Sequence, residues 1–288
     1  MGVSITIIRT MITQDGSLVA PRTIFRRFKA KMKTHFLGCS AFFLLSTLAA
    51  GAGPETVAEL VQRSLRAEFF AGSSTRIRAR LVLTGKDGKS QDRAFSAWGK
   101  RDENGQRRTL VRFESPASVE GVSFLMSQRA AEPDEQYLYL PKFKSTRRIG
   151  GASERQSSFM GSDFSYADLE RKDVRDATYE VLGDETVAGK PCAHVIARPR
   201  AASAYSRVEL WIRRADAVAL RIAMFDADGA LLKTTVTRRV RVVDGEPVIV
   251  ESRTENARTG HVTELVVEEV TRADNLDDAF FSPASLAR

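Results

Sequence analysis

Cysteine and histidine are scarce in this sequence, with two cysteines and three histidines among 288 residues. If an export signal covering residues 1–52 is removed, only Cys192 remains, and no disulfide can form within the chain. Only His194 and His261 are then left, too few for a histidine-based metal site unless carboxylates supply most of the ligands. We therefore expect no metal centre, and we interpret these three residues as structural.

Motifs of known catalytic sites are also missing. The chain has no Gly-x-Ser-x-Gly elbow, no glycine-rich phosphate loop and no His-Glu-x-x-His sequence. Acidic residues are plentiful, but the pairs Glu268-Glu269 and Asp277-Asp278 are typical of solvated charges, and unplaced carboxylates do not define a glycosidase pair. We expect no enzymatic activity and no cofactor. A cluster of carboxylates deep inside the fold would instead favour a hydrolase.

The body of the chain lacks an excess of charge of one sign. The formal net charge is +8, but residues 1–52 account for +6 of it and residues 53–288 for +2. A nearly neutral body argues against a phosphate-binding surface, so we expect no nucleic-acid partner. Hydrophobic residues make up 43% and charged residues 28%, enough apolar side chains for a packed core.

An export signal is predicted at the front of the chain. An apolar run over residues 36–50 follows a basic cluster (Arg26, Arg27, Lys29, Lys31 and Lys33) and ends in Ala50-Gly51-Ala52, the small-x-small pattern of a signal-peptidase site. We predict cleavage after Ala52 and a periplasmic location. The run is too short for a comfortable membrane span.

Three details of this signal stay open. The 31 residues before Met32 are an unusually long leader, so Met32 is a candidate for the true start and residues 1–31 should be dispensable for export. An uncleaved anchor is one alternative to cleavage. Lipidation at Cys39 is another, although a chain beginning at Met32 has almost no apolar residues ahead of that cysteine.

The rest of the chain shows one helical pattern followed by many strand patterns. Residues 55–71 place apolar side chains at intervals of three and four, which predicts a helix that ends at Gly72. From residue 76 the period changes to two, as in a half-buried strand. Turn signals such as Lys86-Asp87-Gly88-Lys89, Gly183-Asp184 and Ala188-Gly189-Lys190 separate the strands. The predicted strands are 76–83, one through Phe95 and Trp98, 107–114, 121–128, 135–140, 144–149, 175–183, 190–198, 205–213, 218–225, 231–242, 247–256 and 261–271.

This pattern predicts a mainly β fold of the α+β class. Short connections exclude a parallel α/β fold, and a flat sheet of twelve or thirteen strands would curl. We therefore expect residues 53–288 to form a single domain, built on a strongly curved antiparallel sheet or unclosed β-barrel. The N-terminal helix and a helical or loop lid would lie on its apolar concave face.

Residues 150–174 interrupt the strand rhythm. The segment is too long for a hairpin, and it carries Phe159, Met160, Phe164, Tyr166 and Leu169 among small polar residues. Long connections in compact domains tend to be functional or disordered, and the aromatic content argues against disorder. Two interpretations remain: a plug that packs one end of the barrel, or a lid over a hydrophobic cavity whose aromatics could be replaced without unfolding the sheet.

Several motifs together resemble one protein family. They are Phe113-Glu114-Ser115-Pro116, Gly121-Val122-Ser123-Phe124-Leu125, Tyr137-Leu138-Tyr139-Leu140-Pro141, Arg147-Arg148-Ile149 and the run from Ser158 to Tyr166. In these motifs the chain is similar to the outer-membrane lipoprotein-sorting family, of the LolA/LolB-type lipoprotein carriers. The resemblance covers nearly all of residues 53–288. It implies an unclosed barrel in the periplasm, a cavity for lipid or lipoprotein acyl chains, and an inner-membrane transporter and outer-membrane acceptor as partners.

A cavity of this kind gives a set of candidate ligand-binding residues. They are the large apolar side chains of the predicted strands and of the long segment: Leu81, Phe95, Trp98, Val111, Phe113, Phe124, Leu125, Tyr137, Tyr139, Phe159, Met160, Phe164 and Tyr166. Ordinary core packing would produce the same pattern. The sequence therefore favours a carrier of a lipid, lipoprotein or similar amphiphile, and a non-catalytic envelope scaffold that docks a protein on its concave face remains the alternative. A cavity would favour the carrier, and a filled interior would favour the scaffold.

Overall fold

The computed structural model describes residues 55–67, 74–129, 134–273 and 276–288. Contacts between Cα atoms divide the chain into Met1–Gly51 and Ala52–Arg288, and the fold below belongs to the second unit. The predicted signal peptide, with Cys39 and the cleavage site after Ala52, lies outside the described residues. No helix in the described part is both long and apolar enough to cross a membrane.

Thirteen antiparallel strands form one sheet, as the strand pattern predicts. Their order is β6-β5-β4-β3-β2-β1-β13-β12-β11-β10-β9-β8-β7, so nearly every strand pairs with its neighbour in sequence. The exception is the pairing of β1 with β13, which joins the two halves of the chain. The strands are β1 Ser74–Thr84, β2 Ser90–Arg101, β3 Arg107–Phe113, β4 Ser123–Ser127, β5 Glu135–Leu140, β6 Ser145–Arg148, β7 Ala177–Val187, β8 Lys190–Pro199, β9 Arg207–Arg213, β10 Ala219–Phe225, β11 Leu231–Val243, β12 Glu246–Asn256 and β13 Val262–Arg272.

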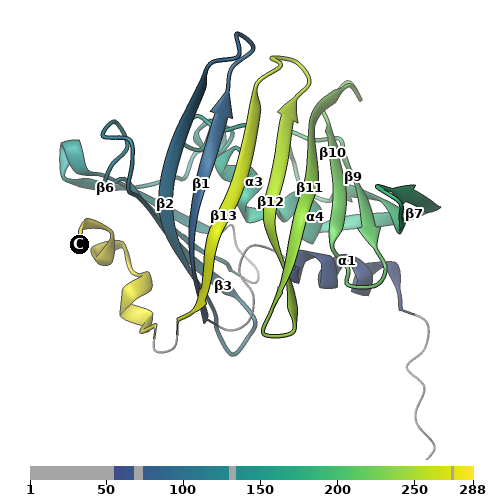
Figure 1. Ribbon diagram of the computed structural model, residues 1–288, viewed down its shortest axis with the longest axis horizontal. Coiled ribbons are helices and arrows are strands. Elements are labelled where there is room, and N and C mark those ends of the chain that lie inside the picture. Colours follow the sequence, from purple (N-terminus) through teal and green to yellow (C-terminus); the bar gives the residue numbers. More distant parts are fainter. Residues whose placement is uncertain (1–54, 68–73, 130–133, 274–275) are drawn as a thin grey trace, which may run out of the picture. The chain divides into compact units, whose positions relative to one another are not determined.

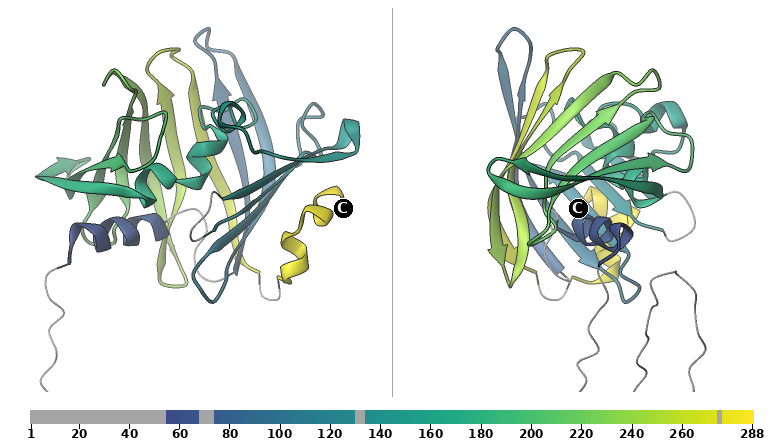
Figure 2. Two further views of the ribbon diagram at one scale, coloured as in Figure 1. Left: turned by 180° about the vertical axis from the view of Figure 1, so that it is seen from behind. Right: turned by 90° about the vertical axis from the view of Figure 1, so that its right-hand side faces the viewer.

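The sheet curls around a concave face without closing (Figures 1 and 2). Strands twist relative to their neighbours, so a sheet of this width cannot stay flat. Strand β1 shows which side chains face inward, because Ile77 and Leu81 are buried while Arg78 and Arg80 between them are more exposed. The predicted fold class is therefore confirmed: an unclosed curved sheet with charge outside and an apolar concave face.

One predicted turn is wrong. Gly183-Asp184 does not end a strand, because β7 continues to Val187. Gly183 has φ 139° and lies where the β7–β8 register shifts between Val181 and Gly183. A glycine inside a strand pattern often marks a bulge rather than a turn, since a bulge also needs unusual backbone angles.

Helix α1 (Val57–Arg66) packs on the concave side of strands near the β7 edge. Thr56 and Glu59 form a reciprocal capping box that fixes its start. Leu60 and Val61 are buried in a cluster that includes Leu210 of β9.

Residues 149–176, which we call the crossing segment, cover the concave face. They connect β6 to β7, the two outermost strands, so the chain must pass from one edge of the sheet to the other. The crossing segment contains three short helices, α2 (Ala152–Arg155), α3 (Tyr166–Glu170) and α4 (Lys172–Arg175). Figure 2 shows α3 and α4 lying across the inner side of the sheet. The sequence-based expectation of a helical cover is confirmed here.

The C-terminal residues cover part of the outer face. The 3-10 helices η2 (Asp278–Phe281) and η3 (Pro283–Ala287) bring Phe281 and Leu286 against Leu110 of β3 and Leu125 of β4. Both faces of the β2–β5 region are therefore apolar. A third 3-10 helix, η1 (Pro141–Phe143), forms the turn between β5 and β6.

Candidate functional site

A cavity of about 240 Å³ lies between the concave face and the crossing segment. Strands β1 to β4 and the neighbouring β13 supply its apolar wall. The large apolar side chains of this wall are Ile77, Leu81, Phe95, Val111, Phe124, Met126 and Leu265. This volume falls just below the 300–1,000 Å³ that is usual for small-ligand pockets. The interior is thus not solid.

The crossing segment supplies the cover of this cavity, and an aromatic cluster holds it down. Phe159 and Phe164 both line the space. The Phe159 ring lies 5.2 Å from Phe124, 5.9 Å from Phe113 and 5.5 Å from Tyr166, measured between ring centroids. Such tilted and edge-to-face pairs add stability beyond the area they bury. Phe159, only 6% exposed, is therefore a core anchor of the cover, while the half-buried Phe164 is packed less tightly.

The opposite wall of the cavity carries polar side chains among apolar ones such as Ile222 and Met224. Lys233 of β11 is 8% exposed, and its Nζ lies 2.8 Å from Oδ2 of Asp168 on α3. The Tyr205 hydroxyl donates to Oδ1 of the same carboxylate at 2.6 Å. Oδ2 also accepts the Ser165 amide at 2.7 Å in the capping box of α3. A buried charge needs such partners, so this contact ties the cover to the sheet.

Other polar groups line the same side. Hydroxyl side chains of β11 and β12 form a stripe consisting of Thr235, Thr237, Ser252 and Thr254. Asp173 also faces the cavity, and burial raises the pKa of its carboxyl group. Within the described part, the buried hydroxyls of Ser64 and Thr109 at the cavity wall have no hydrogen-bond partner. The cavity is therefore mainly apolar, with polar groups along β11, β12, α3 and α4 that could meet the polar end of an amphiphile.

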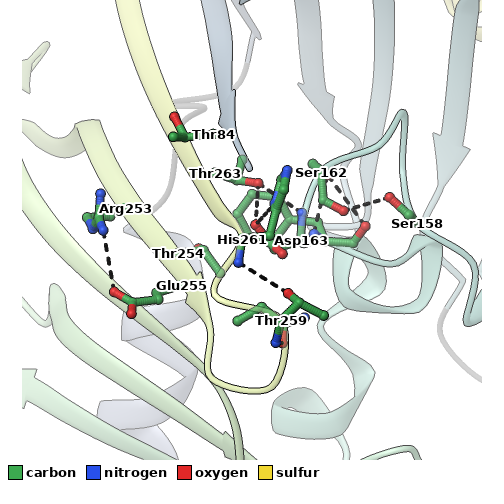
Figure 3. A network of polar contacts seen from close by, with 12 residues as sticks. Thr84, Ser158, Ser162, Asp163, Arg253, Thr254, Glu255, Thr259, His261 and Thr263 are labelled. Carbon is green, nitrogen blue, oxygen red and sulfur yellow. Dashed lines mark hydrogen bonds and ion pairs between the residues drawn. The ribbon is translucent and has the colours of Figure 1, made fainter. Parts of the chain in front are cut away.

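A second polar contact fixes the middle of the crossing segment to β13 (Figure 3). The Asp163 amide donates to Thr263 Oγ1 at 2.9 Å, and the Thr263 hydroxyl donates to Asp163 Oδ2 at 2.7 Å. His261 Nδ1 lies 2.7 Å from the same oxygen. The nearby hydroxyl of Ser162 donates to the Phe159 carbonyl, and that of Ser158 to the Ser162 carbonyl. Among the described residues no hydroxyl or thiol is hydrogen-bonded to the His261 ring, and the contacts of Asp163 attach the crossing segment to β13.

Two further contacts hold the ends of the cover. The Gln136 amide of β5 donates to Glu170 Oε1 at 2.9 Å, and Arg155 pairs with the same carboxylate. On the other side, the Arg93 guanidinium of β2 donates to the Met160 carbonyl, and burial lowers its pKa. A Cβ at Gly161 would come within 3.2 Å of that guanidinium, and its φ of +77° also favours glycine. The crossing segment is thus attached to β2, β5, β11 and β13.

The structure separates the predicted ligand-binding residues into three groups. Those that line the cavity are Leu81, Phe95, Val111, Phe124, Phe159 and Phe164. Phe113, Met160 and Tyr166 pack in the same apolar cluster but are not part of the lining. Trp98, Leu125, Tyr137 and Tyr139 belong to the cluster under the C-terminal helices on the outer face.

That last placement corrects the prediction for those four residues. Neighbouring strand positions face opposite sides of a sheet, so Phe124 and Leu125 cannot both line one cavity. Tyr137 and Tyr139 likewise alternate with the inward-facing Gln136 and Leu138. The sequence pattern missed the polar groups of the cavity, because Lys233 and Asp168 were not distinguished from solvated charges.

No described group of three or more His, Cys, Asp and Glu side chains could hold a metal ion. His194 lies between two carboxylates, with Nδ1 2.7 Å from Glu185 and Nε2 3.2 Å from Glu209, and its ring stacks on Trp211. Two carboxylates, Asp168 and Asp173, do line the cavity. Asp168 is already bonded to a lysine, a tyrosine and a backbone amide, which is the environment of a structural carboxylate rather than a general acid or base.

Comparison with known proteins supports the same architecture. A family model described as "-like: Uncharacterized protein" matches residues 105–288. An outer membrane lipoprotein-sorting protein domain from Vibrio parahaemolyticus is 26% identical and matches with a TM-score of 0.74, over 80% of this chain and 98% of that one. The chain therefore has the LolA-like fold of outer-membrane lipoprotein-sorting domains.

Two further structures extend this result. A DUF1329 family protein from Desulfovibrio piger is 27% identical to this LolA-like chain, with a TM-score of 0.74 over 80% of this chain and 97% of that one. A LolA superfamily protein from Nitrosomonas europaea is 18% identical, with a TM-score of 0.63 over 79% of this chain and 98% of that one, and it shares the fold. The comparison with curated proteins finds no match.

Proposed function

We propose that this protein is a non-catalytic carrier of the cell envelope, which holds an acyl chain of a lipid, lipoprotein or similar amphiphile in its cavity. The observation that carries the proposal is the cavity itself, which lies between the curved sheet and the crossing segment. Burying an acyl chain stabilises the complex by about 0.8 kcal/mol per methylene, or on the order of 10 kcal/mol for a long chain before ordering costs. No directional chemistry is needed for such binding.

The volume of the cavity limits the size of the cargo. A volume of about 240 Å³ suits one acyl chain rather than a folded domain. The apolar wall over β1 to β4 would take the chain, and the hydroxyl stripe of β11 and β12 would face the ester or hydroxyl end of the amphiphile. Binding to an envelope scaffold partner would need the concave face to be open, whereas the crossing segment covers it.

The similarity to a lipoprotein-sorting domain supports a location in the cell envelope for this carrier. The similar domain from Vibrio parahaemolyticus is described as lipoprotein-sorting. We propose that the protein works in the periplasm, receives its cargo from an inner-membrane transporter and delivers it to an outer-membrane acceptor. Export would depend on the N-terminal signal, with the mature chain starting at Gly53.

Binding can be tested with a fluorescent fatty acid probe and two tryptophan variants of the purified protein. Ile222 of β10 lines the cavity, so Ile222→Trp should fill part of it. Val236 of β11 is 38% exposed and pairs with Arg221 rather than with Ile222, so Val236→Trp is the matched control on the outer face. Displacing two methylenes of ligand should weaken binding by about tenfold. We expect this loss in Ile222→Trp only. Equal binding by both variants and the parent would contradict the cavity as the site.

Processing is tested separately. Mass spectrometry of the mature N-terminus should give Gly53, and a chain beginning at Met32 should be exported as well as the full chain. An acylated Cys39 would show a lipoprotein instead, and retention of the Met32 chain in the cytoplasm would show that residues 1–31 are needed.

A further inference from the structure

The turn between β5 and β6 has an unusual surface. Residues 142–148 are all exposed, as are 86–92 and 180–186 in two other hairpins, but this run contains a phenylalanine. At the centre of the turn, the Phe143 side chain is 69% exposed. Burying this ring against a partner surface would stabilise a complex by removing apolar area from water.

Basic residues flank Phe143 in the sequence. Residues 141–148 contain Lys142, Lys144, Arg147 and Arg148 and no acidic residue. Arg147 pairs with Glu154 of α2. Lys142, Lys144 and Arg148 make no ion pair or hydrogen bond with any other described side chain. The turn therefore carries an excess of positive charge around one apolar ring.

Protection of the sheet edge explains only part of this pattern. Strand β6 is an edge strand, and charged side chains on an edge prevent pairing with other sheets. That role would account for the lysines and arginines, but an exposed phenylalanine works against it.

A second exposed apolar turn provides a comparison. Val242 in the β11–β12 hairpin is 73% exposed, but there the acids Asp244 and Glu246 offset the charge of the neighbouring Arg241. Exposed apolar side chains thus occur at more than one turn of this sheet, and the surrounding charge distinguishes the Phe143 turn.

We propose that the β5–β6 turn, residues 141–148, docks the protein on an anionic phospholipid surface. Phe143 would enter the interface between headgroups and acyl chains, and the surrounding cations would meet the lipid phosphates. Basic residues near an anionic leaflet and aromatic rings at the interface are the two features by which proteins bind such surfaces. The anion could in principle belong to an acidic protein, but a single protruding ring without a neighbouring apolar patch suits a fluid lipid surface better than a shaped protein groove.

The docking turn is connected to the cover of the cavity. Arg147 is paired with Glu154, and the Gly150 amide donates to the same carboxylate at 3.1 Å. Glu154 lies in α2, the first helix of the crossing segment. Docking would therefore place the start of the cover at the membrane. The proposal goes beyond the carrier function and does not depend on the cavity being filled.

Vesicle flotation tests this directly. The full chain and its variants are mixed with vesicles of phosphatidylcholine alone or of phosphatidylcholine with phosphatidylglycerol, at low and high salt. We expect binding to the anionic vesicles that decreases with salt. Phe143→Ser should weaken it about tenfold, and replacing Lys142 and Lys144 with glutamine should weaken it about fivefold for each lysine.

Val242→Ser is the matched control, because it removes an equally exposed apolar side chain from a turn that contains acids. It should bind like the parent, and any contribution of the N-terminal residues is common to all variants. The proposal is overturned if no anionic vesicles are bound, if neutral vesicles are bound equally, or if Phe143→Ser binds like Val242→Ser. Fatty acid probe binding should be unchanged in Phe143→Ser, so failure of docking and failure of the carrier function can be distinguished.

Discussion

The contact between Lys233 and Asp168 gives the sharpest prediction about the cover. Both side chains are about nine-tenths buried, and the two atoms lie 2.8 Å apart. Replacing Lys233 with methionine would leave a buried carboxylate with only Tyr205 and the Ser165 amide as partners. Removing one partner of a buried pair costs about 3–5 kcal/mol, and we expect the lower end of that range because both side chains keep some exposure.

Urea unfolding measures this cost. For a domain of this size the slope is about 3 kcal/mol per molar urea, so Lys233→Met should lower the unfolding midpoint by roughly 1 M. In the double variant with Asp168→Asn, the effects should be non-additive by about 1–3 kcal/mol, since both changes remove one interaction.

Arg198→Met is the control for this experiment. Arg198 pairs with Glu180 at 3.4 Å on the surface, with both side chains about half exposed, and such pairs contribute about 0–1 kcal/mol. If Lys233→Met shifts the midpoint no more than Arg198→Met does, the crossing segment is not held to β11 as described.

Three further predictions concern single side chains. Phe164→Ser should increase the dissociation rate of the fatty acid probe while leaving the far-ultraviolet circular dichroism unchanged, whereas Phe159→Ser should cost about 3–5 kcal/mol of stability because that ring is part of the buried cluster. Burial raises the pKa of Asp173, so the folded state binds its proton more tightly than the unfolded chain. The stability that the neutral Asp173 carboxyl allows is fully present at low pH. It is lost as the pH rises through the pKa of this carboxyl in the folded state. Asp173→Asn should therefore gain stability relative to the parent as pH rises above the ordinary pKa of an aspartate, and a difference that does not change with pH would contradict the burial of this carboxyl. Cys192 is fully buried, and burial raises the pKa of its thiol, so iodoacetamide should modify it in concentrated urea but not in the native protein.

The strands could be predicted from the sequence because the signals are local. Alternation of apolar and polar residues, as in β1, and glycine turns such as Gly88 give both the strands and their antiparallel pairing. The pairing of β1 with β13 is not local, and this pairing makes β6 and β7 the edges of the sheet. A reader of the sequence who does not know this pairing can see that the segment after β6 is long. The sequence alone does not show that this segment must cross the concave face.

The residues of the candidate site were predicted less completely than the strands, and Trp98 and Leu125 are examples of residues assigned to the wrong face of the sheet. Strand periodicity shows that adjacent residues face opposite sides, but it does not show which side encloses a cavity when both sides are apolar. Here the C-terminal helices bury the outer face, so large apolar residues are needed on both sides. The polar groups of the cavity were missed because a lysine in a strand, such as Lys233, usually faces water. Its burial is explained only by the position of Asp168 across the cavity.

Native mass spectrometry of the protein purified from cells expressing the full chain tests the central claim most directly. The carrier account predicts a population with the added mass of one acyl-chain amphiphile per protein. Organic extraction should release this molecule, and Ile222→Trp should lack it while Val236→Trp retains it. A parent protein that carries no amphiphile, and that also fails to take up a fatty acid probe, would contradict the account and favour the envelope scaffold.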